Sequence, residues 1–129
     1  MGVYIVQHKI YPLWIKVGHH KITQKRPNVY FRFVRRGFHS CICPPEIQDC
    51  CDFEHIQLLS FYPNLSTKDE KKIHSYLENI QHRLRCGEWF ENCDLDLLSH
   101  FIFNHLKGIL DMPSDYDLIY AKQKLKIKN

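Results

Sequence analysis

The chain has 129 residues, of which 44% are apolar and 13% aromatic, a composition that predicts one folded domain and excludes a disordered protein. No apolar run approaches the ~20 residues of a membrane span, and the N-terminus lacks the pattern of a signal peptide. We therefore expect no membrane partner, a cytoplasmic location in a reducing environment, and six cysteines present as thiols.

The net charge of +4 conceals a segregation of charge along the chain. Residues 1–43 contain eight Lys or Arg and no acidic residue, residues 44–121 contain all fourteen acidic residues, and four lysines lie between 122 and 128. A basic block that begins on a predicted sheet indicates a phosphate-bearing partner. The alternative is that the basic and acidic blocks face each other in the fold.

Three segments have the pattern of β-strands. Val3–Gln7 and Leu13–Val17 are rich in β-branched and aromatic residues, and the short break between them contains Pro12, which predicts a β-hairpin. Residues 21–40 are predicted to be irregular. The third strand is predicted over Glu54–Tyr62, directly before a proline.

Two helices are predicted after these strands, over Thr67–Arg83 and Asp94–Met112. The fold class is therefore α/β: a single compact domain over 1–113, with a three-stranded antiparallel sheet flanked by helices, and a basic C-terminal extension over 114–129. The second helix is apolar almost all round, which favours a central place in the core. The alternative is a homodimer through the 94–112 helix.

The first predicted helix has an informative register around Glu70. The apolar stripe consists of Ile73, Leu77, Ile80 and Leu84, and Glu70 and His74 fall on the same stripe. A carboxylate that points inward is costly unless it is paired or bound to a metal. However, Thr67-x-x-Glu70 also matches a capping box, in which Glu70 only satisfies backbone donors at the helix start.

Five short motifs occur in a distinctive order. They are Gly2-Val3-Tyr4, Lys16-Val17-Gly18, Lys25-Arg26, Glu70-x-x-x-His74 and Gly87-Glu88-Trp89-Phe90. Together they resemble the GIY-YIG endonuclease superfamily over roughly residues 1–92. They are most similar to a branch of small phage and large-DNA-virus proteins with Lys in place of the second Tyr. The resemblance implies a GIY-YIG-like catalytic domain over 1–113.

The resemblance implies metal-dependent hydrolysis of phosphodiesters. In this family pattern Glu70 binds a single Mg²⁺ or Mn²⁺ ion, which acts as a Lewis acid. Arg26 holds the phosphate oxygens as negative charge builds, and Tyr4 activates the nucleophilic water. Lys16, on the neighbouring strand, could lower the pKa of Tyr4 through proximity of charge.

The remaining candidate site residues are basic or polar. His20 and Lys25 belong to the predicted catalytic group, since histidine titrates near neutrality. The predicted substrate-binding residues are His19, Arg32, Arg36, His74 and Asn92. Pro27 directly follows Arg26, where many relatives continue a helix, so Arg32, Arg35 and Arg36 are rivals for the phosphate-binding role. Tyr4 and Lys16 also have ordinary explanations, as a strand aromatic and an exposed strand charge.

Two substrates fit one such active site. The resemblance to an endonuclease family favours DNA as the substrate. The chain has no room for a second module that binds the DNA duplex, which favours a small nucleotide such as a cyclic dinucleotide. A third hypothesis is that the chain has lost catalysis and is a binding module for nucleic acid or a host protein. The presence of Lys16 in place of the family's second Tyr motivates this hypothesis. The spacing of Cys41, Cys43, Cys50 and Cys51 disfavours a structural zinc site, because neither pair forms a C-x₂₋₄-C knuckle.

Overall fold

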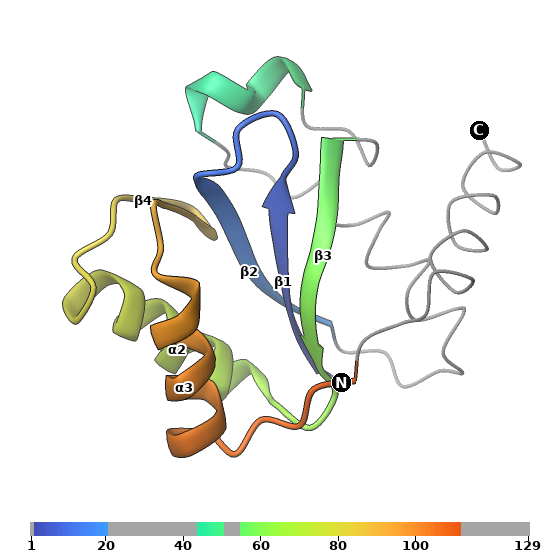
Figure 1. Cartoon of the computed structure of the whole chain (residues 1–129), viewed down its shortest axis with the longest axis vertical. Coiled ribbons are helices and arrows are strands. Elements are labelled where there is room, and N and C mark those ends of the chain that lie inside the picture. Colours follow the sequence, from blue (N-terminus) through green and yellow to red (C-terminus); the bar gives the residue numbers. More distant parts are fainter. Residues whose placement is uncertain (1, 21–43, 51–54, 112–129) are drawn as a thin grey trace, which may run out of the picture.

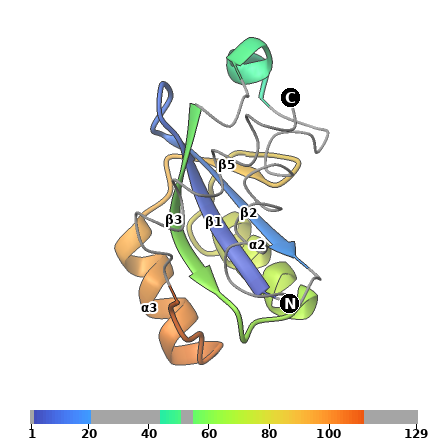
Figure 2. The ribbon, with the colours of Figure 1, turned by 90° about the vertical axis from the view of Figure 1, so that its right-hand side faces the viewer.

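The computed structural model describes residues 2–20, 44–50 and 55–111, which form a small α/β domain with an antiparallel sheet and two helices. The sheet has five strands in the order β3-β1-β2-β5-β4. Both helices, α2 and α3, lie on one side of the sheet (Figures 1 and 2), while the short helix η1 lies near the β1–β2 turn. The element bounds are β1 Gly2–His8, β2 Trp14–His20, η1 Pro45–Cys50, β3 Ile56–Tyr62, α2 Thr67–Asn79, β4 Arg85–Cys86, β5 Trp89–Glu91 and α3 Leu95–His105.

The predicted N-terminal hairpin is confirmed. β1 pairs antiparallel with β2 in a register that runs from Gly2 opposite His20 to Gln7 opposite Ile15. β1 is also paired with β3, so it is an interior strand, and nearly all its residues are buried. Successive residues of β1 point to opposite faces of the sheet and are nevertheless buried, which explains why its sequence is a continuous apolar run rather than an alternating one. β2 continues past the predicted end at Val17, which brings Gly18 and His19 into the sheet.

The expectation of a three-stranded sheet is wrong, because a second hairpin adds β4 and β5. β5 pairs with β2, with Lys16 opposite Trp89, and β4 pairs with β5 across a tight turn at Gly87 and Glu88. Gly87 has a φ of 61°, which only glycine adopts without steric cost. Strands of two and three residues are too short to show an alternating pattern, so the sequence pattern contains no signal for them.

Both helices are shorter than predicted. α2 ends at Asn79 rather than Arg83, so Ile80 and Leu84 are exposed instead of completing the core stripe. α3 ends at His105 rather than Met112, and the side chain of its N-cap, Asp94, accepts a hydrogen bond from the backbone of Leu97 at 3.1 Å. The cap fixes where the helix begins, and packing decides where it ends.

α3 covers the edge of the core and does not run through its centre. Within this helix only Leu98 and Ile102 are buried, whereas Leu97 and Phe103 are exposed. The expected central position is therefore wrong, and a homodimer through 94–112 stays a prediction. Within the described residues, no helix combines the length and the apolar character that crossing a bilayer requires.

The hydrophobic core lies between the sheet and the two helices. It unites residues from β1, β2 and β5 with the inward stripes of α2 and α3, and Tyr62 and Leu65 close one end. The completely or almost completely buried members are Val3, Ile5, Ile15, Val17, Leu65, Ile73, Leu77, Phe90, Leu98 and Ile102. This packing holds β2 between β1 and β5, and so fixes the strand that carries the candidate site.

Candidate functional site

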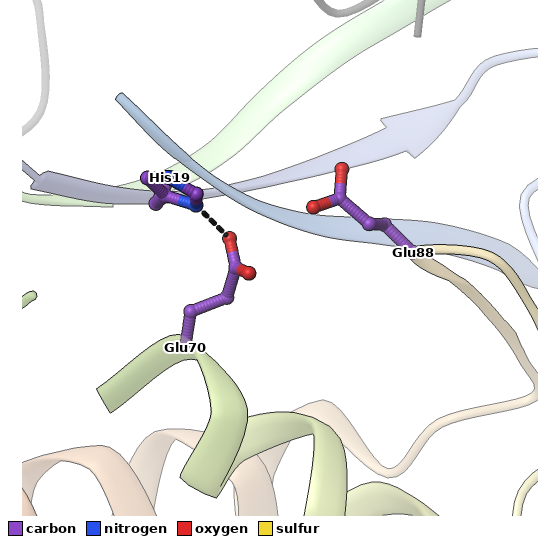
Figure 3. A group of neighbouring side chains, drawn as sticks. All are labelled: His19, Glu70 and Glu88. Carbon is purple, nitrogen blue, oxygen red and sulfur yellow. Dashed lines mark hydrogen bonds and ion pairs between the residues drawn. The ribbon is translucent and has the colours of Figure 1, made fainter. Parts of the chain in front are cut away.

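Three side chains of types that can bind a metal ion, from three separate elements, lie close together at one end of β2 (Figure 3). His19 lies on β2, Glu70 in the first turn of α2, and Glu88 in the β4–β5 turn, and their ligand atoms all lie within 4.8 Å of one another. His19 Nδ1 is 2.7 Å from Glu70 Oε2. Figure 3 shows the Glu88 carboxylate directed toward the other two side chains. The group therefore offers one imidazole nitrogen and two carboxylates to a cation.

Glu70 points into the site because another residue caps the helix. The N-cap of α2 is Ser66, and its backbone N–H donates to Asp69 Oδ2 at 2.8 Å. The capping box thus begins one residue earlier than Thr67-x-x-Glu70, so the capping role for Glu70 is wrong. Glu70 is 5% exposed, and its carboxylate is paired with His19 instead. A buried carboxylate needs such a partner or a cation.

A buried lysine lies next to this group. Lys16 is 1% exposed, and its Nζ is 3.7 Å from Glu88 Oε1. A buried ammonium is stable only when it is paired, and Glu88 supplies a carboxylate close to it. The same Nζ lies 5.8 Å from the centre of the Tyr4 ring, on the neighbouring strand. The alternative explanation of Lys16 as an exposed charge on a strand is therefore wrong.

Tyr4 occupies space that the missing side chain of Gly18 leaves open. The two residues are directly opposite in the β1–β2 register. A Cβ at Gly18 would be 2.5 Å from the Tyr4 hydroxyl oxygen and 2.6 Å from Cζ, which are impossible contacts. Tyr4 is 4% exposed, so its ring has little room to move aside. Gly18 is thus required for the observed position of the phenol.

His74 connects α2 to β2 close to the site. It is 6% exposed, and its Nε2 lies 2.9 Å from the Val17 carbonyl oxygen. Its Nδ1 is 3.3 Å from a guanidinium nitrogen of Arg85, which also forms an ion pair with Glu78. With Arg85 as donor to Nδ1, the proton of His74 is on Nε2 and is donated to Val17. Both ring nitrogens are engaged by the protein, which makes His74 suited to positioning α2 against β2.

The structure does not bring all predicted site residues to this group. Asn92 is exposed, and its backbone N–H donates to the Leu13 carbonyl at 2.7 Å, at the end of β2 opposite to His19. The backbone of His20 pairs with Gly2, but its side chain is outside the described residues. Outside the described residues altogether are Lys25, Arg26, Arg32, Arg35, Arg36, Cys41, Cys43 and Cys51.

Glu88 is the site residue that the sequence interpretation missed. The sequence pattern gives Glu88 no role beyond its place in the Gly87-Glu88-Trp89-Phe90 motif. Its neighbours Trp89 and Phe90 are buried, 1% and 0% exposed, whereas Glu88 lies in the turn and stays partly accessible. A polar turn residue directly before two aromatic residues is the available signal in the sequence, but the partners of Glu88 on β2 and α2 lie far away in the sequence.

The chain matches no protein-family model, and comparisons with curated proteins and with solved structures find no match either. The evidence for its function is therefore the geometry of the His19, Glu70 and Glu88 side chains with the adjacent Lys16 and Tyr4.

Proposed function

We propose that this protein is a divalent-metal-dependent phosphodiesterase whose site lies at the end of β2. The observation that carries the proposal is the buried Glu70 carboxylate, which contacts His19 and lies beside the pair formed by the buried Lys16 and the partly exposed Glu88. Inward-facing charges of this kind are costly to fold, and they cluster where binding or catalysis requires them. The resemblance to GIY-YIG endonucleases likewise implies that Glu70 binds the metal ion and that Tyr4 activates the attacking water.

The side chains present fit a hard or borderline divalent ion. Glu70 and His19 would hold one Mg²⁺ or Mn²⁺ ion, since carboxylate oxygen suits both metals and imidazole nitrogen suits Mn²⁺ in addition. When bound, the ion supplies a Lewis acid for a phosphate oxygen. Glu70 is fixed for this task by the first turn of α2, and His19 by its place in the sheet.

Tyr4 and Lys16 supply the proton chemistry in this proposal. Tyr4 acts as a phenolate that accepts the proton of the attacking water and becomes the phenol, and the Lys16 ammonium beside its ring favours the ionised form. The close fit of Tyr4 over Gly18 holds the phenol in one orientation. Arg26, Arg32 and Arg36 are the proposed phosphate-binding cations, and they lie outside the described residues.

The proposed substrates are DNA and small nucleotides such as cyclic dinucleotides. The test is to incubate the purified chain with supercoiled DNA, linear DNA, RNA and cyclic dinucleotides, each with Mg²⁺, with Mn²⁺ and with EDTA. We expect metal-dependent hydrolysis of at least one of these, and a loss of roughly 10²-fold or more for Glu70→Gln. Glu91→Gln is the matched control, because it removes the same charge from a residue of β5 outside the group.

Wild-type activity in Glu91→Gln together with loss in Glu70→Gln supports the proposal. Equal activity of Glu70→Gln and wild type would contradict it. If the wild type cleaves none of these substrates but binds one of them, with the same affinity as Glu70→Gln, the chain is instead a binding module on this fold. The same panel therefore separates the enzyme from the non-catalytic alternative.

A further inference from the structure

We propose that Glu88 is a third protein ligand of the metal ion and that the resulting His19–Glu70–Glu88 centre selects Mn²⁺ over Mg²⁺. This inference rests on the proposed function only for the presence of a divalent ion at Glu70. It goes beyond the Glu70–His19 site of the proposed function, because it adds a second carboxylate from a separate element and a preference between metals. It also assigns a role to the β4–β5 hairpin.

The distances suit a shared ion. Around a Mn²⁺ or Mg²⁺ ion with bonds of ~2.1 Å, opposite ligand atoms are about 4.2 Å apart and adjacent ones about 3 Å. The three ligand atoms lie within 4.8 Å of one another, and the His19–Glu70 pair is at 2.7 Å. A movement of about 1 Å in the Glu88 side chain is therefore enough for all three to reach one ion.

The backbone of Glu88 is held in place, so its side chain is available at a defined point. The Glu88 carbonyl accepts a hydrogen bond from the Val17 backbone at 3.0 Å, which attaches the turn to the strand that carries His19. Trp89 follows directly, pairs with Cys86, and is 1% exposed. In contrast, the Glu88 side chain is 31% exposed and can adjust. A rigid main chain with an adjustable carboxylate is suited to metal binding.

The ligand set decides which metal is favoured. Mg²⁺ prefers oxygen ligands and keeps most of its waters, so the imidazole of His19 adds little to its affinity. Mn²⁺ accepts nitrogen and oxygen together and tolerates less regular geometry. Two carboxylates with one imidazole therefore favour Mn²⁺, and His19 is the residue that supplies this preference.

Lys16 limits the affinity of the centre. Its ammonium lies 3.7 Å from Glu88 Oε1 and is almost fully buried, so its charge is poorly screened and repels a cation at the site. Removing this charge should strengthen metal binding, even where it weakens hydrolysis. Lys16→Met is thus expected to move binding and activity in opposite directions, which a loss of folding cannot do.

The test is calorimetric titration of the full chain with MnCl₂ and with MgCl₂, without substrate. We expect one Mn²⁺ per chain, bound more tightly than Mg²⁺, and a loss of roughly tenfold or more in Mn²⁺ affinity for Glu88→Gln. His19→Gln should reduce the ratio of Mn²⁺ to Mg²⁺ affinity. Glu91→Gln is the matched control, because it removes the same charge from the same hairpin outside the group. The melting temperature of each variant monitors folding.

The results separate this inference from the proposed function. If Glu88→Gln binds Mn²⁺ like the wild type while Glu70→Gln loses binding, Glu88 is not a ligand and the inference fails, although a metal at Glu70 remains. If Glu88→Gln weakens Mn²⁺ binding but no phosphodiester is cleaved by the wild type, the metal centre stands and the proposed function fails. A change in Glu91→Gln as large as in Glu88→Gln would show a general charge effect and overturn the inference.

Discussion

Replacing Gly18 with alanine tests how closely the Tyr4 ring lies against the Gly18 backbone. The added methyl would lie 2.5 Å from the Tyr4 hydroxyl oxygen and 2.6 Å from Cζ, whereas carbon atoms in contact are normally about 3.5–4.0 Å apart. The Tyr4 ring must therefore move by about 1 Å within a packed sheet. Gly18 is not among the residues of positive φ, so the expected cost comes from this contact and not from backbone strain.

Overpacking a core of this kind costs about 1–3 kcal/mol, and we expect about 2 kcal/mol for Gly18→Ala because the ring is almost fully buried. For a domain of this size, 2 kcal/mol lowers the melting temperature by roughly 8 °C. Equilibrium unfolding in urea gives the free energy of unfolding directly. Under the proposed function, hydrolysis should fall as well, since the phenol is displaced.

A double-mutant cycle isolates the contact from other effects. Tyr4→Leu removes the hydroxyl oxygen and Cζ, so Gly18→Ala in that background should cost less than about 0.5 kcal/mol. The expected coupling between the two sites is then about 1.5 kcal/mol. If Gly18→Ala costs the same in both backgrounds, the Tyr4 ring does not lie against Gly18 and this account of the site is wrong.

Three further predictions concern His74 and Cys93. His74→Phe leaves the Val17 carbonyl without its buried donor and should cost about 1–3 kcal/mol in urea unfolding; a cost near zero would show that His74 does not tie α2 to β2. Burial raises the pKa of the Cys93 thiol from 9.0 to about 12, although the nearby Arg83 opposes the shift. Cys93 should therefore resist iodoacetamide at pH 9, as followed by mass spectrometry, and rapid labelling of the folded chain would contradict this. Because the pKa of Cys93 is higher in the folded state than in the unfolded state, the stabilising contribution of this thiol is complete below about pH 9 and is lost as the pH rises from 9 toward 12. The free energy of unfolding should therefore depend less on pH over this range in Cys93→Ala.

The sequence by itself determined the elements that depend on local pattern. The β1–β2 hairpin, β3 and the existence of both helices follow from runs of β-branched residues and from helical spacing of apolar residues. The inward position of Glu70 and His74 also follows, because residues four apart on a helix share a face. These features depend on neighbours in the chain, which the sequence presents directly.

Only the tertiary structure decided which distant residues meet. β4 and β5 form because β2 offers a free edge to them, and their own lengths of two and three residues carry no pattern. That pairing buries Lys16 and places Glu88 beside it, although the two are far apart in the sequence. Ser66 and Thr67 are both residue types that cap helices, so the sequence alone allowed either as the N-cap. Because Ser66 is the N-cap, Glu70 has no capping role and its carboxylate pairs with His19. The candidate site is thus a product of long-range contacts, in which burial and charge pairing select one arrangement from several that the local sequence allows.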